Sequence, residues 1–216
     1  MSRRSTFTDQ SVTYGAIGAT LDPDLLRYPP AGFVPAEDTV RLGSGRERYE
    51  QSAESLMTWG VQQGSGFTVV DAAPGTGAQY TGIAYDPAGA PLAEQPAPRA
   101  EERYAADGTP YITAGMTATL RRRGRLRSRN IPVLVVYVVD EPNRAGFAIG
   151  TAGAAPENGE ESFILEHRDD DSVWLTIRSA YEPNGGLRRA LAPLLRRRRR
   201  ELTTRELRAL HPAFPT

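Results

Sequence analysis

The sequence predicts an α+β fold in which a curled antiparallel sheet is covered by a long C-terminal helix. Two observations carry this prediction. Four strand-like segments joined by short turns lie between residues 133 and 180, and consecutive strands joined by short turns pair antiparallel. Directly after them, leucines recur at helical spacing as far as Leu210, and Pro212 ends that helix.

Length and composition indicate one domain with long loops. The chain has 216 residues, of which 39% are hydrophobic, with 21 glycines and 17 prolines. That length suits one sizeable core. We expect a disordered N-terminal tail over residues 1–12, a single domain over 13–210 and a C-terminal tail over 211–216. Residues 88–109 are rich in proline and alanine and predict an extended surface loop within the domain.

Charge and residue usage exclude several classes of function. The formal net charge is zero, so nucleic acid is not expected as a partner. The absence of cysteine excludes disulfides and thiolate ligands and favours a reducing cytoplasm. No signal peptide is visible, and the longest apolar run, residues 133–139, is too short to span a bilayer. Two histidines do not make a metal cluster, so neither a metal nor another cofactor is expected.

The first half of the chain predicts one amphipathic helix. Ser44 precedes Glu47 by three residues, the spacing of a capping box, in which each side chain satisfies a free backbone N–H group. From Tyr49 to Leu56 the apolar residues recur every three or four positions. Gly60, which follows Trp59, is expected to end the helix.

Three shorter segments of the first half have strand character. They are Phe67–Val70, Tyr80–Tyr85 and Tyr111–Arg123. Six arginines then lie between residues 121 and 129. On alternating strand positions these side chains project mostly into water, so we interpret them as a solvated face.

The register of the four later strands follows from their turns. The turn Asp169–Asp171 puts Phe163 opposite Ile177, and the turn after Asp140 puts Tyr137 opposite Phe147. The even-numbered positions are mixed in polarity, so we expect that face to be wet. The odd-numbered face is apolar and is built from Val135, Tyr137, Phe147, Ile149, Phe163, Leu165, Leu175 and Ile177.

The last helix is expected to cover this odd-numbered face. Five consecutive arginines, Arg196–Arg200, spread around the helix at 100° per residue, so at least one of them must lie near the apolar side. The apolar side itself consists of Leu187, Leu191, Leu194, Leu195, Leu202 and Leu210.

Polar side chains within the apolar face suggest a binding site. Tyr137 lies in the middle of the face, and Thr151, Glu161 and Ser179 are expected on one row at its end. Such a row at the mouth of an apolar groove can bind a small, partly apolar ligand. Phe147 and Phe163 would form the apolar wall of this candidate site. The alternative interpretation is that the row is only the wet rim of the sheet.

Two other functions stay open at this point. The first is an enzyme that uses the same cavity for proton transfer or hydrolysis, with Glu161 as base and Tyr137 as acid. The second is an interaction module whose Arg-rich helix meets an acidic partner or, against the charge argument above, nucleic acid. The sequence does not decide the number of chains in the assembly.

Several short motifs together resemble an uncharacterised bacterial and plant family, known as domain of unknown function nineteen-ninety. The resemblance runs from Thr13 to Leu210, and the family has no established reaction. The fold it implies is similar to helix-grip proteins of the START and polyketide-cyclase type, whose cavity lies between the sheet and the last helix. The chain departs from the family at Ile149, where tyrosine is usual, and at Ala155-Pro156, where His-Pro is usual. The motifs are Thr13-Tyr14, Gly18-Ala19-Thr20, Ala31-Gly32-Phe33, Arg41-Leu42-Gly43-Ser44-Gly45, Leu56–Trp59, Val136–Pro142, Arg144–Ala148, Gly150-Thr151 and Gly159–Phe163.

Overall fold

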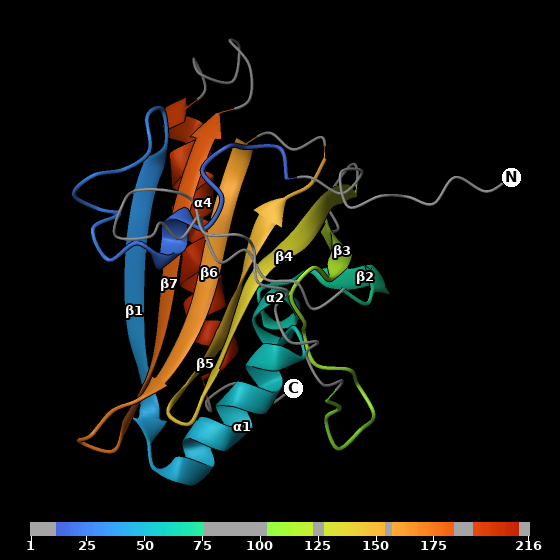
Figure 1. Cartoon of the computed structure of the whole chain (residues 1–216), viewed down its shortest axis with the longest axis vertical. Helices are drawn as coiled ribbons and strands as arrows, with labels where there is room; N and C mark the ends of the chain where they lie inside the picture. The colour runs from blue at the N-terminus through green and yellow to red at the C-terminus, as the bar shows by residue number, and fades with distance from the viewer. Residues whose placement is uncertain (1–11, 76–102, 123–127, 154–156, 184–191, 212–216) are drawn as a thin grey trace, which may run out of the picture.

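The described part of the chain forms one seven-stranded antiparallel sheet and three α-helices. The computed structural model describes residues 12–75, 103–122, 128–153, 157–183 and 192–211. The strand order is β1-β7-β6-β5-β4-β3-β2 (Figure 1). The strands are β1 (Val34–Ser44), β2 (Thr68–Ala73), β3 (Thr117–Arg122), β4 (Arg129–Glu141), β5 (Arg144–Thr151), β6 (Glu157–His167) and β7 (Ser172–Pro183). The helices are the short 3₁₀ helix η2 (Ala19–Leu21), then α1 (Arg46–Met57), α2 (Gly60–Gly64) and α4 (Ala192–Ala209).

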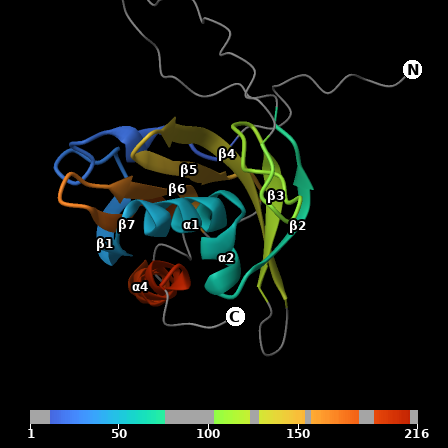
Figure 2. The same cartoon turned by 90° about the horizontal axis from the view of Figure 1, so that it is seen from below.

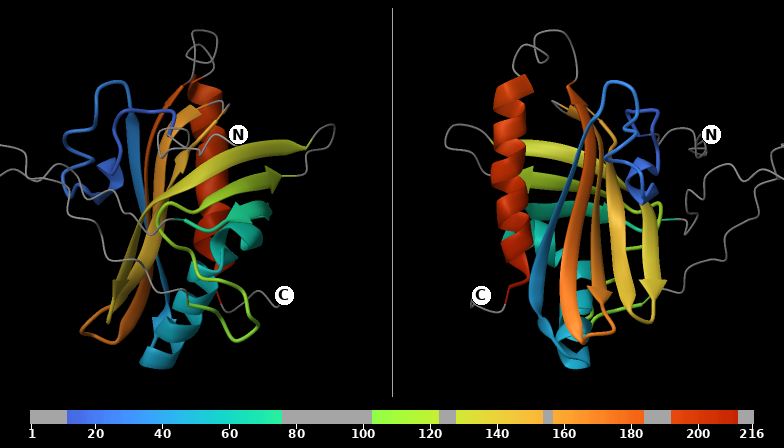
Figure 3. Two further views of the ribbon diagram at one scale, coloured as in Figure 1. Left: turned by 45° about the vertical axis from the view of Figure 1, so that its right-hand side comes forward. Right: turned by 90° about the vertical axis from the view of Figure 1, so that its left-hand side faces the viewer.

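The sheet is strongly curled, and its two faces are covered differently. Helices α1, α2 and α4 lie against one face, which we call the inner face (Figure 2). The segment before β1 lies against the opposite, outer face, and α4 runs along the sheet beside β1 and β7 (Figure 3). The predicted α+β class, a curled antiparallel sheet with a C-terminal helix over it, is confirmed.

The predicted register of β6 and β7 is confirmed. Phe163 lies opposite Ile177 and Leu165 lies opposite Leu175. The turn between these strands is tight, and Asp171 takes a left-handed backbone conformation with φ of 63°. Aspartate tolerates that conformation better than most residues, so the acidic turn fixes this pairing.

The predicted pairing of Tyr137 with Phe147 is wrong, because β4 contains a bulge. Val135 lies opposite Ile149, but Tyr137 lies opposite Ala148 and Val138 opposite Phe147. The one extra residue reverses which side chains face inward from that point on. Tyr137 therefore belongs to the outer face, where it packs in a separate cluster of buried residues with Val136, Val139, Ala148 and Ile164.

The prediction that the whole even-numbered face is wet is also wrong. Glu160 and Ser162 of β6 are fully buried on this outer face. The N-terminal segment covers them, since Tyr14 and Thr20 both bond the Glu160 carboxylate. Further toward β7 the even positions Trp174, Thr176 and Arg178 are only partly buried.

The small residues on the outer face of β5 leave room for that N-terminal segment. A Cβ atom on Gly150 would lie 2.4 Å from the Tyr14 hydroxyl. We therefore predict that Gly150→Ala destabilises the protein by about 2 kcal/mol, as overpacking does. Urea unfolding measures the change. The matched control is Gly15→Ala, because no atom lies within 4 Å of a Cβ there; equal effects of the two changes would contradict this packing.

Helix α1 begins differently from the prediction. Ser44 continues β1 opposite Ser172, so the N-cap is Gly45, with φ of 97° and no side-chain cap bond. Glu47 accepts a hydrogen bond from Gln51 instead of reaching back to the helix start. The expected capping box does not form, because strand pairing fixes the backbone of the serine. The predicted apolar stripe is confirmed, since Tyr49, Leu56 and Met57 are buried.

The other elements of the first half of the chain agree only in part with the prediction. Gly60 starts α2 rather than ending the helical region, and Trp59 supplies the left-handed break with φ of 68°. The strand expected from Phe67 is β2. The strand expected from Tyr111 begins only at Thr117. Residues 80–85 and 88–102 lie outside the described residues, while Tyr104 and Pro110 form an isolated bridge.

Helix α4 has a more polar inner side than the leucine pattern predicts. Leu210 is buried and Leu202 is partly buried, but Leu194 is exposed. Leu187 and Leu191 lie outside the described residues. The most buried side chains of the helix itself include Thr203 and Glu206, so α4 presents polar groups to the sheet.

Candidate functional site

A group of charged side chains is enclosed between the sheet and α4. It consists of Glu157 and Glu161 from β6, Tyr181 from β7, and Arg199 and Glu206 from α4, and we call it the Arg199 cluster. Three carboxyl groups here share one guanidinium group. Charged groups are rarely buried unless they are fully paired, so this set requires an explanation.

The ion pairs of Arg199 are long. Its Nη1 atom lies 3.4 Å and 3.5 Å from the two carboxylate oxygens of Glu161, and Nη2 lies 3.5 Å from Glu157 Oε2. Charge-assisted hydrogen bonds are commonly about 2.7–2.9 Å long. The guanidinium also lies over the Tyr181 ring, 3.4 Å from its centroid. The cation is therefore held between a ring and two carboxylates without a close bond to either carboxylate.

Burial shifts the acidity of the two inner carboxyls. The Glu161 side chain is only 4% exposed, and burial raises its pKa, with Glu157 adding to the rise and Arg199 opposing it. Burial also raises the pKa of Glu206 well above its ordinary value, and the nearby charge of Glu161 adds to the effect. Glu206 therefore favours the protonated form, in which it can donate a hydrogen bond.

Several polar atoms on the helices lack partners among the described residues. Glu206 is 2% exposed, and its Oε2 atom has no hydrogen-bond partner there. The same holds for Nε of Arg199, for both amide atoms of Gln62 on α2, and for the Ser52 hydroxyl on α1. A buried polar atom without a partner costs about 1–3 kcal/mol. Bound molecules with polar groups would satisfy such atoms.

The raised pKa of Glu206 gives a pH-dependent prediction. The folded protein retains the Glu206 proton above the ordinary value of 4.5, whereas the unfolded chain loses it. The contribution of Glu206 to the free energy of unfolding therefore falls as the pH rises above 4.5. Glu206→Gln cannot titrate, so we expect it to be about 1–2 kcal/mol more stable than the native protein at neutral pH. Thermal unfolding across pH measures this, and a difference that persists unchanged at acid pH would contradict the assignment.

The structure brings together two of the predicted polar site residues. Glu161 and Ser179 lie directly opposite each other in β6 and β7. On the other side of Glu161 lies Ile149 of β5, the position where the family resemblance would place a tyrosine. Thr151 lies beyond this row, and its hydroxyl bonds the Thr13 hydroxyl and the Gly159 N–H. The predicted row of three is therefore a pair.

The apolar part of the predicted site lies on the inner face, as expected. The rings of Phe147 and Phe163 are 5.6 Å apart, and both residues are fully buried. Trp59 packs edge-on against Phe147 at 5.5 Å. Trp59, between α1 and α2, therefore covers Phe147, and α1 is the helix that lies against β5 and β6, whereas α4 lies against β7 and β1.

The paired acid–base roles of Glu161 and Tyr137 do not fit the geometry. Glu161 faces α4 on the inner side, whereas the Tyr137 hydroxyl bonds Thr20 on the outer side, 2.8 Å away. One molecule cannot contact both groups across the sheet. Sequence reasoning missed Glu206, although it falls one helical turn before Leu210 and four residues after Leu202 and thus on the leucine side of α4.

A second buried carboxylate organises the outer face. Glu160 accepts hydrogen bonds from the Tyr14 hydroxyl, the Gly18 N–H, and both the N–H and the hydroxyl of Thr20. The Thr20 hydroxyl also lies 2.8 Å from the Tyr137 hydroxyl. We call this set the Glu160 network. Its carboxylate oxygens are well supplied with donors, in contrast to those of the Arg199 cluster, so its role is to hold the N-terminal segment on the sheet.

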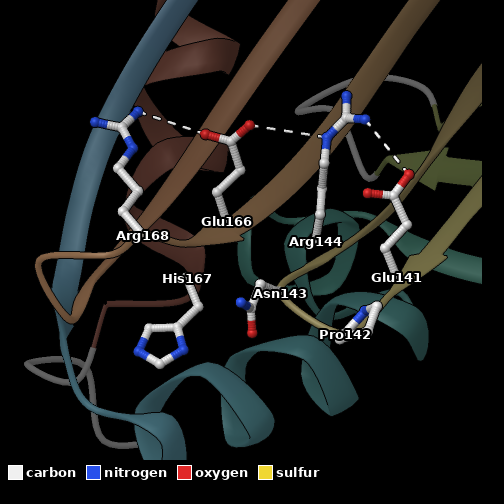
Figure 4. A pocket seen from close by; sticks show the side chains of 7 residues that line it. All are labelled: Glu141, Pro142, Asn143, Arg144, Glu166, His167 and Arg168. Carbon is white, nitrogen blue, oxygen red and sulfur yellow. Dashed lines mark hydrogen bonds and ion pairs between the residues drawn. The ribbon is translucent and has the colours of Figure 1, made fainter.

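A surface pocket of about 400 Å³ lies between the β4–β5 turn and the end of β6 (Figure 4). Its charged side chains form an exposed ladder in which Arg144 lies between Glu141 and Glu166, 3.8 Å from each. Glu166 also pairs with Arg168 at 3.5 Å. Exposed ion pairs of this kind contribute little to the stability of the folded protein. The pocket is separate from the Arg199 cluster and contains neither its carboxyls nor its unpartnered atoms.

Within the described ranges, no three His, Cys, Asp or Glu side chains are placed to hold a metal ion, the carboxyls of the Arg199 cluster included. Of the helices the structure describes, none is both long and apolar enough to cross a bilayer.

Comparison with known proteins identifies relatives of this chain. The family model described as "Domain of unknown function (DUF1990)" matches residues 13–92 and 85–209. A protein named UPF0548 from Deinococcus radiodurans is 44% identical over 43 residues, which is 20% of this chain and 22% of that protein.

Two solved structures are similar in shape. The hypothetical protein jhp0584 of Helicobacter pylori aligns with a TM-score of 0.52 and 12% identity, covering 93% of this chain and 96% of that one. Ara h 8.0201 aligns with a TM-score of 0.45 and 7% identity, covering 83% and 98%. At such identities the first of these likenesses concerns the fold alone.

Proposed function

The chain belongs to the DUF1990 family, whose function is unknown, and from this starting point we propose that it binds a small, partly apolar molecule between the inner face of its sheet and α4. The Arg199 cluster supplies the polar end of the site, and the phenylalanine side of the inner face supplies the apolar end. The observation that carries this proposal is the buried Oε2 atom of Glu206, which has no partner among the described residues, beside the loosely paired Arg199.

The contrast between the two buried carboxylate networks supports the proposal. Glu160 has four donors at hydrogen-bond distance and needs no further partner. Glu161 has one cation at 3.4 Å, and Glu206 has an atom without a donor or acceptor in the described residues. In a purely structural cluster, the buried polar atoms would be expected to have hydrogen-bond partners within the protein, as they do in the Glu160 network. Unfilled hydrogen-bonding capacity at one site suits a ligand that fills it.

The experiment is capture of metabolites followed by native mass spectrometry. Purified protein is incubated with a small-molecule extract of bacterial cells and desalted, and bound molecules are released and identified. We expect a defined added mass on the native protein and at least a tenfold lower occupancy for Glu161→Gln and Glu206→Gln. A molecule that contacts the cluster must lose affinity when either carboxyl becomes an amide.

The matched control is Glu201→Gln, since Glu201 lies on the same helix and pairs with Arg197 in the open. That variant should keep the native occupancy. Equal occupancy in all four proteins would place the molecule elsewhere and remove the proposal. The hypothesis of an acidic partner for the Arg-rich helix stays a prediction beside this one.

A further inference from the structure

We infer that the polar end of this site accepts an organic cation, a protonated amine carried on an apolar body, and that Glu206 gives up a proton when the amine binds. The inference rests on the proposed function and names its ligand class. It follows from three features of the cluster: its excess of carboxyl groups, the Glu206 oxygen that has no partner among the described residues, and the long ion-pair distances of Arg199.

The charge balance of the cluster favours a cation. Within the described part of the chain, Glu161 from β6, Tyr181 from β7 and Arg199 from its own helix interact electrostatically with Glu206, and Glu157 from β6 faces Arg199. Three carboxyl groups thus stand against one guanidinium. With all three carboxyls ionised, a second cation would lower the excess negative charge from two to one, whereas a carboxylate or phosphate would raise it.

The geometry leaves an acceptor for an ammonium group. Glu206 Oε2 is buried and has no partner in the described part of the chain. The Glu161 oxygens hold Arg199 only at 3.4 Å and 3.5 Å, so they retain capacity for another donor. An ammonium group has three N–H donors, which suits a site that offers several carboxyl oxygens.

Proton exchange follows from the same arrangement. Before an amine binds, Glu206 is held in its protonated form by burial, which raises its pKa, and by the charge of Glu161, while the charge of Arg199 opposes this rise. When a protonated amine arrives, the carboxyl ionises to pair with it, and its proton leaves to solvent. Net charge within the site is unchanged by the exchange, which avoids the cost of burying an uncompensated ion.

The test uses three probes with one apolar body and different end groups: phenethylamine, phenethyl alcohol and hydrocinnamate. Titration calorimetry at neutral pH in two buffers of different ionisation heat gives both affinity and protons exchanged. We expect phenethylamine to bind at least tenfold more tightly than the alcohol or the carboxylate. We also expect the release of about one proton per amine bound.

Variants separate this inference from the proposal beneath it. Glu206→Gln should bring the amine to within about threefold of the alcohol and abolish proton release, while Glu201→Gln should change neither. If the alcohol or hydrocinnamate matches the amine in a Glu161-dependent way, ligand binding stands and the amine class is wrong. If phenethylamine does not bind, or binds without releasing a proton, the inference is overturned, and metabolite capture decides the proposed function on its own.

Discussion

Glu160→Ala is expected to lower the free energy of unfolding by about 4 kcal/mol, the size of effect that follows when one partner of a buried charged network is removed. The change leaves the Tyr14 hydroxyl, the Gly18 N–H and both donors of Thr20 without their acceptor. These donors hold residues 13–21 on the outer face, so that segment should lose its protection from amide exchange. Urea unfolding and hydrogen exchange measure the two effects.

The matched control for this change is Glu166→Ala on the same strand. Its carboxylate lies at the surface and makes only long pairs with Arg144 and Arg168, so a loss under about 0.5 kcal/mol is expected. Comparable losses from the two alanine variants would show that the Glu160 network does not hold the segment.

Arg199→Met is expected to cost about 3 kcal/mol at neutral pH, toward the lower end of the range for breaking a buried pair, since the side chain is 20% exposed and its bonds are long. The change leaves Glu161 and Glu157 without their cation. Both inner carboxyls, Glu161 and Glu206, already have raised pKa values from burial, and the loss of Arg199 removes the charge that opposes the rise.

The pH dependence of this variant has a definite sign. At pH values below the ordinary carboxyl pKa of 4.5, Glu161 is protonated in both the folded and the unfolded protein, so only the packing of the Arg199 stem is lost. Above that value the unfolded chain ionises freely and the folded variant does not, so the loss grows as pH rises. Arg197→Met, two residues away on the exposed side, should cost less than about 0.5 kcal/mol at any pH. A loss for Arg199→Met that is the same at acid and neutral pH would contradict this electrostatic account.

Local patterns predicted the strands and the last helix because each follows from neighbouring residues. The acidic turn at Asp169–Asp171 fixes the pairing of Phe163 with Ile177, and each of the two lies six residues from that turn. The helical period likewise required one arginine of the run Arg196–Arg200 to face the sheet, and Arg199 does so.

The position of Tyr137 depends on a β-bulge, which the alternation of apolar and polar residues does not reveal. A single bulged residue near Val136 reverses which side chains of the rest of β4 face inward. Both faces of that strand are apolar, so neither orientation would expose apolar residues on one face only. A pattern that is apolar on both sides leaves the register free to slip.

The two buried networks required long-range contacts. Glu160 and Glu161 are neighbours on one strand and point to opposite faces, yet both are buried. Their partners, Thr20 and Arg199, lie 140 residues before and 38 residues after them. Nothing in the local sequence distinguishes such a carboxylate from one on a wet face, which is why the outer face was expected to be exposed.

The central claim is that the interior beside the Arg199 cluster holds a small molecule, and a high-resolution crystal structure of the protein, purified without denaturation, tests it most directly. The account predicts density that belongs neither to the chain nor to a lone water, within hydrogen-bond distance of Glu206 Oε2 and continuing toward the phenylalanines of the inner face. Direct bonds from Glu206 Oε2 to protein atoms, with short Arg199–Glu161 bonds and no such density, would contradict it.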